Sequence, residues 1–122
     1  MADNKRYVTQ AQENGGIMIS EDVVAAIAAH AIKEVPGVVA VSSKPGSDVA
    51  DLIGRRNWNK GIRVLISDKN TLAIYCNIVV AYSNNIVSVA SAVQKAVADA
   101  VESITGVKVR MVNVNVCEIV RQ

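Results

Sequence analysis

Residues 62–82, IRVLISDKNTLAIYCNIVVAY, decide the fold, because two alternating apolar runs flank a polar turn. Side chains of a strand alternate between its two faces, so a run with period two predicts a strand. The turn, Ser67-Asp68-Lys69-Asn70, consists largely of turn-forming residues. These features predict a β-hairpin. In its second strand one face carries Leu72, Ile74, Cys76, Ile78, Val80 and Tyr82, and the other carries Ala73, Tyr75, Asn77, Val79 and Ala81.

The segment after the hairpin predicts a helix and a final strand. Ser83-Asn84-Asn85 offers capping side chains, and Gly106 tolerates the left-handed conformation in which helices commonly end. The last strand runs from about residue 107 to 120, and its alternation changes parity near Met111-Val112, which indicates a β-bulge. Apolar residues recur at helical spacing between cap and glycine: Ile86, Val89, Ala90, Val93, Ala96, Val97, Ala100, Val101 and Ile104.

The segment before the hairpin has a similar arrangement. Residues 17–19 predict a short strand, Ser20 a helix N-cap, Pro36-Gly37 the helix end, and residues 38–41 another strand. The helix carries an apolar stripe of Val24, Ile27, Ala28, Ala31 and Val35. Val24, Ala28 and Gly37 match Val93, Val97 and Gly106 of the second half. Two explanations of the match are open: independent convergence on the same helix–Gly–strand arrangement, or an old duplication.

Together these segments predict a single domain over residues 17–120, preceded by a flexible N-terminal arm over residues 1–16. The expected order is β-α-β-β-β-α-β. The expected fold is α/β (α+β), a two-layer sandwich with two helices packed on one face of a mixed sheet. The helices are expected to cover the even-numbered hairpin face. The other face would be open to solvent or to a partner, and it carries Tyr75, Asn77, Val79, Asn113 and Asn115.

Composition bounds the class of protein. The chain has 122 residues, 51% of them hydrophobic, and a net charge of only +2. No apolar run approaches the ~20 residues that span a bilayer, and the N-terminus lacks the apolar region of a signal peptide, so we expect a cytoplasmic protein. Cys76 and Cys117 are expected to be free, partly buried thiols. His30 is the single histidine and is expected near the helix surface, so no catalytic, metal or cofactor site is predicted.

The connection over residues 50–61, ADLIGRRNWNKG, carries the single tryptophan and most of the local charge. From Lys44 to Arg63 there are five cationic residues against Asp48 and Asp51, a local excess of +3. These cations suit an acidic patch on a neighbouring subunit, an anchor protein or an anionic lipid surface. A solvated loop with Trp58 packed on the core is the alternative.

Four segments in this order resemble the alkaline shock protein family, the envelope-stress proteins of Gram-positive bacteria. They are GIMISEDVVAAIAAHAIKEVPGV, ADLIGRRNWNKGIRV, AIYCNIVVAY and VQKAVADAVESITGVKVRMVNVNV. The resemblance implies a small non-enzymatic α/β protein without cofactors. It also implies a cytoplasmic protein held at the inner face of the membrane by a small membrane-anchored partner, and self-assembly. The shared motif residues are Gly37, Gly54, Arg55, Lys60, Gly61 and Gly106.

The predicted function is therefore that of a homo-oligomeric stress-response scaffold, with possible peripheral contact to anionic membrane. Its expected contact surfaces are the open sheet face, an alanine surface formed by Ala25, Ala26 and Ala29, and the basic connection. The alternative is a KH-like nucleic-acid-binding module that uses the basic connection. It is disfavoured because the chain has no GxxG motif and few aromatic residues. The candidate partner-binding residues are Arg55, Arg56, Trp58, Lys60, Tyr75 and Asn77.

Overall fold

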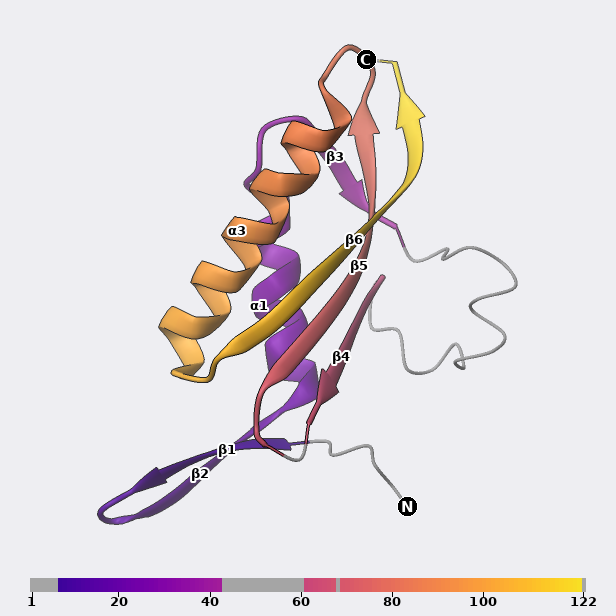
Figure 1. The fold of residues 1–122 in the computed structure, drawn as a ribbon. Helices are drawn as coiled ribbons and strands as arrows, with labels where there is room; N and C mark the ends of the chain where they lie inside the picture. The colour runs from indigo at the N-terminus through magenta and orange to yellow at the C-terminus, as the bar shows by residue number, and fades with distance from the viewer. Residues whose placement is uncertain (1–6, 43–60, 68, 122) are drawn as a thin grey trace.

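The computed structural model describes residues 7–42, 61–67 and 69–121 of the chain. It has an α+β fold in which an N-terminal hairpin precedes a four-stranded sheet covered by two helices (Figure 1). The elements are β1 (Tyr7–Gln12), β2 (Gly15–Ser20), α1 (Glu21–Lys33), β3 (Val38–Val41), β4 (Ile62–Ile66), β5 (Leu72–Ala81), α3 (Ile86–Thr105) and β6 (Val109–Val120).

Strand β5 is the centre of the four-stranded sheet. On one edge it pairs antiparallel with β4 over its first half and with β3 near its end. On the other edge it pairs parallel with β6 along its whole length. The parallel pairing follows from α3, because a helix between two strands carries the chain back to the end at which the first strand began. The predicted mixed sheet is confirmed.

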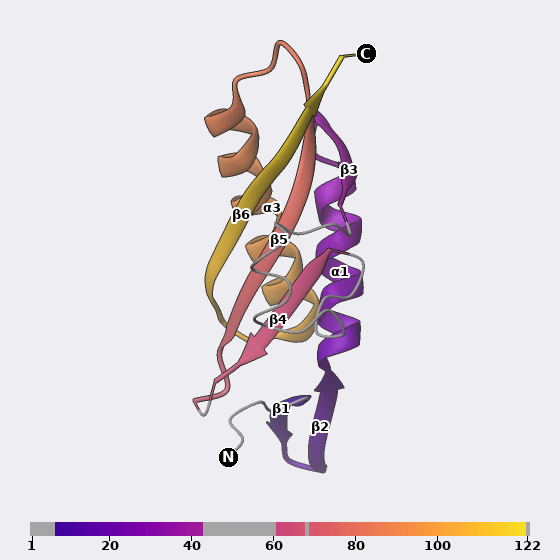
Figure 2. The same ribbon diagram turned by 90° about the vertical axis from the view of Figure 1, so that its right-hand side faces the viewer.

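Both helices lie on the same side of this sheet, as the two perpendicular views show (Figure 1, Figure 2). The even-numbered side chains of β5 face them and are buried, as the hairpin pattern predicts. Branched residues Val and Ile dominate this thin core, which suits close packing of helix on sheet. Its fully buried members include Val24, Ala28, Ile32, Ile74, Ile78, Val93, Val97 and Val101.

Three of the four helix ends follow the predicted signals. The backbone N–H of Val23 donates to Ser20 Oγ at 3.3 Å, and that of Ser88 donates to Asn85 Oδ1 at 2.9 Å. These bonds satisfy amides that the first turn leaves free. Helix α3 ends at Gly106, whose φ of 73° lies in the left-handed region. The two N-caps and the Gly106 end of α3 are therefore confirmed, whereas α1 ends at Lys33 with Glu34 as its C-cap, before the predicted Pro36-Gly37.

The N-terminal segment differs from the expected flexible arm. Residues 7–12 form β1, which pairs antiparallel with β2 from Tyr7↔Ser20 to Gln12↔Gly15. Val8 is fully buried against the core. Asn70, in the turn before β5, also holds β1: its Oδ1 accepts from Thr9 N–H at 2.9 Å, and its Nδ2 donates to Thr9 O at 2.6 Å. The ordering comes from these distant contacts, which local composition does not reveal.

Strand β6 is irregular at two positions. Its register with β5 shifts between Val109 and Met111, which confirms the bulge predicted near residue 111. A second shift lies between Val116 and Glu118 and was not predicted. Successive side chains are exposed at each shift: Arg110 and Met111 at the first, and Cys117, Glu118 and Ile119 at the second.

Candidate interaction surfaces

Four candidate residues of the basic connection, Arg55, Arg56, Trp58 and Lys60, lie outside the described residues. The structure does describe Ser42 and Gly61, the two ends of the longer segment 42–61 that contains this connection. The backbone N–H of Ser42 donates to Asn77 O at 2.8 Å, and the N–H of Asn77 donates to Gly61 O at 3.1 Å. Asn77 of β5 thus holds both ends of the connection together.

Gly61 is required by this convergence. Its φ is +87°, and a β-carbon at this position would collide with the carbonyl oxygen of Ser42. Only glycine accepts both the left-handed backbone and the close approach of another strand. Gly61, one of the shared motif residues, therefore has a direct steric role where the chain rejoins the sheet.

The side chain of Asn77 is fully buried, so the prediction that it lies on an open sheet face is wrong. Its Oδ1 accepts a hydrogen bond from Asn115 Nδ2 of β6 at 3.0 Å, while its own Nδ2 has no hydrogen-bond partner among the described residues. A buried amide is unfavourable unless its polar groups are paired. Asn77 ties β5 to both of its edges, and alternation alone could not distinguish this position from an exposed one.

Tyr75 is the remaining candidate on the same sheet face. It is half-buried and lies in one cross-strand row with Arg63 of β4 and Asn113 of β6. Asn113 and Asn115 are exposed, as expected for this face. A contact of Tyr75 with a partner stays a prediction.

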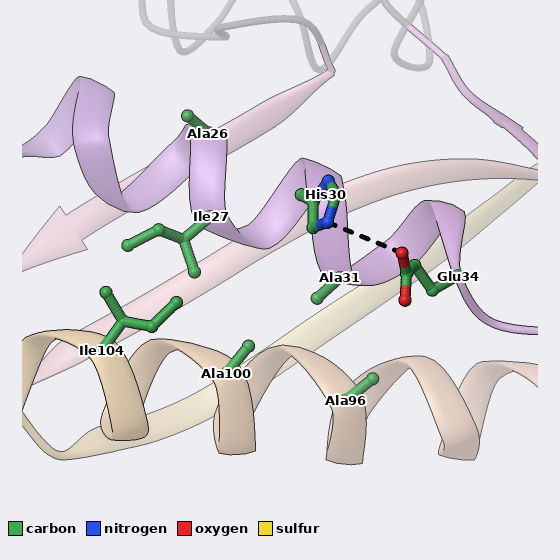
Figure 3. A pocket seen from close by; sticks show the side chains of 8 residues that line it. All are labelled: Ala26, Ile27, His30, Ala31, Glu34, Ala96, Ala100 and Ile104. Atoms are coloured by element: carbon green, nitrogen blue, oxygen red, sulfur yellow. Dashed lines mark ion pairs between the residues drawn. The ribbon is translucent and has the colours of Figure 1, made fainter.

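A groove of about 500 Å³ runs between the outer sides of α1 and α3 (Figure 3). Four alanines and two isoleucines form most of its walls. The one ion pair drawn beside it joins His30 Nε2 to Glu34 Oε2 at 3.5 Å. The lining residues are Ala26, Ile27, His30, Ala31, Glu34, Ala96, Ala100 and Ile104.

This groove replaces the predicted alanine surface. Ala25 is buried, and Ala29 packs against the core, so of the three predicted alanines only Ala26 lines the groove. Helix α1 is rotated relative to the predicted stripe, since Ile32 rather than Ala31 is buried. Ile104, predicted in the core, is 66% exposed because it lies in the last turn of α3. The groove exists only where α1 and α3 lie side by side, so the apolar pattern of one helix cannot predict it.

Catalytic groups are sparse on the described part of the chain. His30 is exposed, as expected, and among the described residues its ion-pair partner is Glu34. Among the described residues no group of three His, Cys, Asp or Glu side chains is arranged to hold a metal ion.

Both cysteines are free, as predicted. Burial raises the pKa of the Cys76 thiol to about 12, and that thiol donates to Asn113 O at 3.6 Å. Cys117 is exposed rather than partly buried; desolvation and then the Glu118 carboxylate raise its pKa. Since the thiolate is the reactive form, neither cysteine has an activated nucleophile's environment.

A two-layer α+β domain with an apolar groove between its two helices defines the class of the protein. The family model of the alkaline shock protein 23 family, described as having a cell envelope-related function, matches residues 9–121, and the chain belongs to this family. The chain is also 28% identical over 103 residues to the uncharacterized protein YqhY of Bacillus subtilis (strain 168). That alignment covers 84% of this chain and 75% of YqhY. No solved structure matches the chain.

Within the described residues, no helix combines the length and the apolar character needed to cross a membrane.

Proposed function

We propose that the protein is a non-enzymatic scaffold of the cell envelope, which self-associates and binds a membrane-anchored partner at the inner face of the membrane. The family's envelope-related description supports the general location. Beyond this location, the protein is proposed to hold a partner by surface contact and to carry out no reaction.

The groove between α1 and α3 is the observation that carries this proposal. Its walls contain small side chains from both helices, Ala26 and Ala31 on one side and Ala96 and Ala100 on the other. Small side chains let another backbone approach closely, and exposed Ile104 adds apolar surface that a partner would remove from water. Such burial stabilises a complex by roughly 25 cal/mol per Å² before the costs of association.

The occupant we propose is the apolar face of an amphipathic helix from the membrane-anchored partner. The groove runs along two neighbouring helices, a surface into which a third helix can pack by its apolar residues. His30 and Glu34 lie beside the apolar walls and would border the polar face of that helix. The basic residues Arg55, Arg56 and Lys60 are proposed as a second contact, to an acidic partner surface or anionic lipid.

Ala100→Arg tests the groove, because it places a long charged side chain between its walls. Ala92→Arg is the matched control, since Ala92 is exposed on the same helix and does not line the groove. We expect Ala100→Arg to lose co-purification with a small membrane protein from native cells with membranes retained, and Ala92→Arg to keep it. Equal capture by both variants would contradict the role of the groove.

The basic connection is tested separately by Arg55→Glu with Arg56→Glu. Weaker recovery in the membrane fraction with an unchanged thermal unfolding midpoint supports the second contact. Unchanged recovery removes the connection from the proposal. Steeply salt-dependent binding of RNA or DNA by the wild type, lost in this variant, would instead favour the nucleic-acid alternative.

A further inference from the structure

Strand β6 has one edge without a strand partner among the described elements. It is twelve residues long and pairs only with β5. It contains no proline, which would block pairing. A long strand edge presents a row of backbone donors and acceptors and is a template for pairing with another chain.

The direction of the β6 backbone groups follows from the ladder with β5. The N–H and C=O of Asn77 form hydrogen bonds on the β3–β4 side of β5. Because these groups alternate along a strand, the backbone N–H and C=O of Cys76 and Ile78 point toward β6. In a parallel ladder a residue bonds the two neighbours of its partner, and the partner of Cys76 is Val114. The backbone N–H and C=O of Asn113 and Asn115 therefore form hydrogen bonds with β5. The backbone groups of Val112, Val114 and Val116 point to the other edge of β6.

A side chain of α3 supports this assignment. Gln94 Nε2 donates to Val112 O at 2.9 Å, so this carbonyl is reached by a group outside β5, and its second lone pair can accept from a partner strand. A hollow of about 370 Å³ lies beside the same edge, between α3 and the beginning of β6. Its α3 wall includes the small residues Ser91 and Ala98.

We propose that β6 pairs antiparallel with β6 of a second copy of the chain, in a register centred on Val114. Val114 then faces Val114 of the second copy, and Val112 faces Val116, so the outward backbone groups of the two strands meet. The two four-stranded sheets become continuous across a twofold axis, with both α3 helices on one face. This proposal rests on the self-association in the proposed function and names its surface.

Charge selects this register. With Val114 at the centre, Arg110 lies opposite Glu118 of the second copy, and the symmetry repeats the pair. Moving the centre by one residue, to Asn113 or Asn115, places Arg110 opposite Val116 or Val120 instead. Opposite charges in direct cross-strand positions stabilise antiparallel pairing.

The two bulges also fit this register. The register shifts near Arg110–Met111 and Cys117–Glu118 lie at matching distances on either side of Val114. A bulged segment of one strand therefore meets the bulged segment of the other, and the regular central residues pair without interruption. The strand is self-complementary in backbone direction, charge and irregularity, as an isologous interface requires.

Disulfide trapping tests both the edge and the register, in full-length protein carrying Cys117→Ser. Asn113 lies opposite Asn115 of the second copy at a position without direct hydrogen bonds, where Cβ atoms are close enough for a disulfide. Asn113→Cys and Asn115→Cys, carried on chains of different mass and mixed, should yield a linked heterodimer on mild oxidation. Each variant alone should yield little linked homodimer.

Each other outcome overturns the proposal in a defined way. Homodimers of Asn113→Cys alone or Asn115→Cys alone would show a different register. No cross-link in the mixture, with a wild type that is dimeric by light scattering, would place self-association on another surface. A wild type that is monomeric at all concentrations would remove self-association from the proposed function as well.

A charge swap provides a second measurement. Arg110→Glu should raise the dimer dissociation constant about tenfold, because two attractive pairs become repulsive. Adding Glu118→Arg should restore the wild-type constant. Lys33→Glu, the same charge change on exposed α1, should leave it unchanged. A loss that Glu118→Arg does not rescue would contradict the Val114 register.

Discussion

The two helix–Gly–strand halves of the molecule share a pattern but differ in what their strands do. After α1, β3 has four residues and runs antiparallel to β5, and it shares its edge of the sheet with β4. After α3, β6 has twelve residues, runs parallel to β5 and has that edge to itself. The same local signal therefore leads to opposite strand directions, because direction depends on where the chain enters the sheet.

The helices differ for a local reason. Pro36 ends α1 early, so that Val35 turns into the core, whereas the matching Ile104 continues in α3 and is exposed. Val97 of α3 matches Ala28 of α1, and both are fully buried. At this matched position α3 buries the larger side chain.

The largest effect is expected from breaking the edge shared by β3 and β4. Gly61→Ala should lower the free energy of unfolding by about 3 kcal/mol or more, because the new β-carbon meets the Ser42 carbonyl and the left-handed φ is strained. Gly15→Ala is the control, since open space surrounds that position and only its φ is unfavourable. Urea unfolding of both variants measures the difference. Equal losses would contradict a steric role for Gly61.

Exchanging the matched core residues tests the difference in packing. Val97→Ala should cost about 2 kcal/mol of unfolding free energy through lost burial and a cavity. Ala28→Val should cost about 1–3 kcal/mol through overpacking against the sheet. Val87→Ala, at a position that is 74% exposed, should change stability by less than about 0.5 kcal/mol. A stabilising Ala28→Val would show that α1 has room for a larger side chain.

The glycines after the two helices should also differ. Gly37→Ala should cost about 2 kcal/mol, since its φ is 96° and the added carbon would lie 2.9 Å from Val89 Cγ2. Gly106→Ala should cost about 1 kcal/mol, because a φ of 73° is the ordinary left-handed helix cap. Chemical denaturation gives both values. The reverse order would mean that the cap of α3, not the α1–β3 turn, is the more constrained position.

The smallest effect is a difference in pH dependence between the cysteines of β5 and β6. The pKa of Cys76 is raised to about 12 in the folded protein, so its neutral thiol stabilises the fold fully below pH 9, and this contribution is lost as pH rises from 9 toward 12. Near pH 10 the loss should be about 1 kcal/mol relative to pH 7. Cys76→Ala should lack this slope. Cys117→Ala, at an exposed site, should retain it, and a wild type without the slope would contradict the burial of Cys76.

Several elements follow from the sequence because their signals are local. Ser20 and Asn85 cap helices through side-chain oxygens that reach amides three residues ahead. The even-numbered residues of β5 face the helices because strand period and apolar pattern coincide. The exact phase of α1 does not follow, since Ala25, Ala28 and Ala31 are the same residue type and therefore do not specify which of them faces the core.

What the sequence determined by itself is the set of helices and long strands, their caps, and the apolar face of the hairpin, since each depends on neighbours within a few residues. Tertiary structure alone decided the strand that residues 7–12 form, the burial of Asn77 and the groove between α1 and α3. Each of these depends on residues distant in the chain: Asn70 for β1, Ser42 and Gly61 for Asn77, and a second helix for the groove. Whether a side chain is buried depends on all the elements that pack around it, whereas periodicity shows only which face of a single helix or strand is apolar.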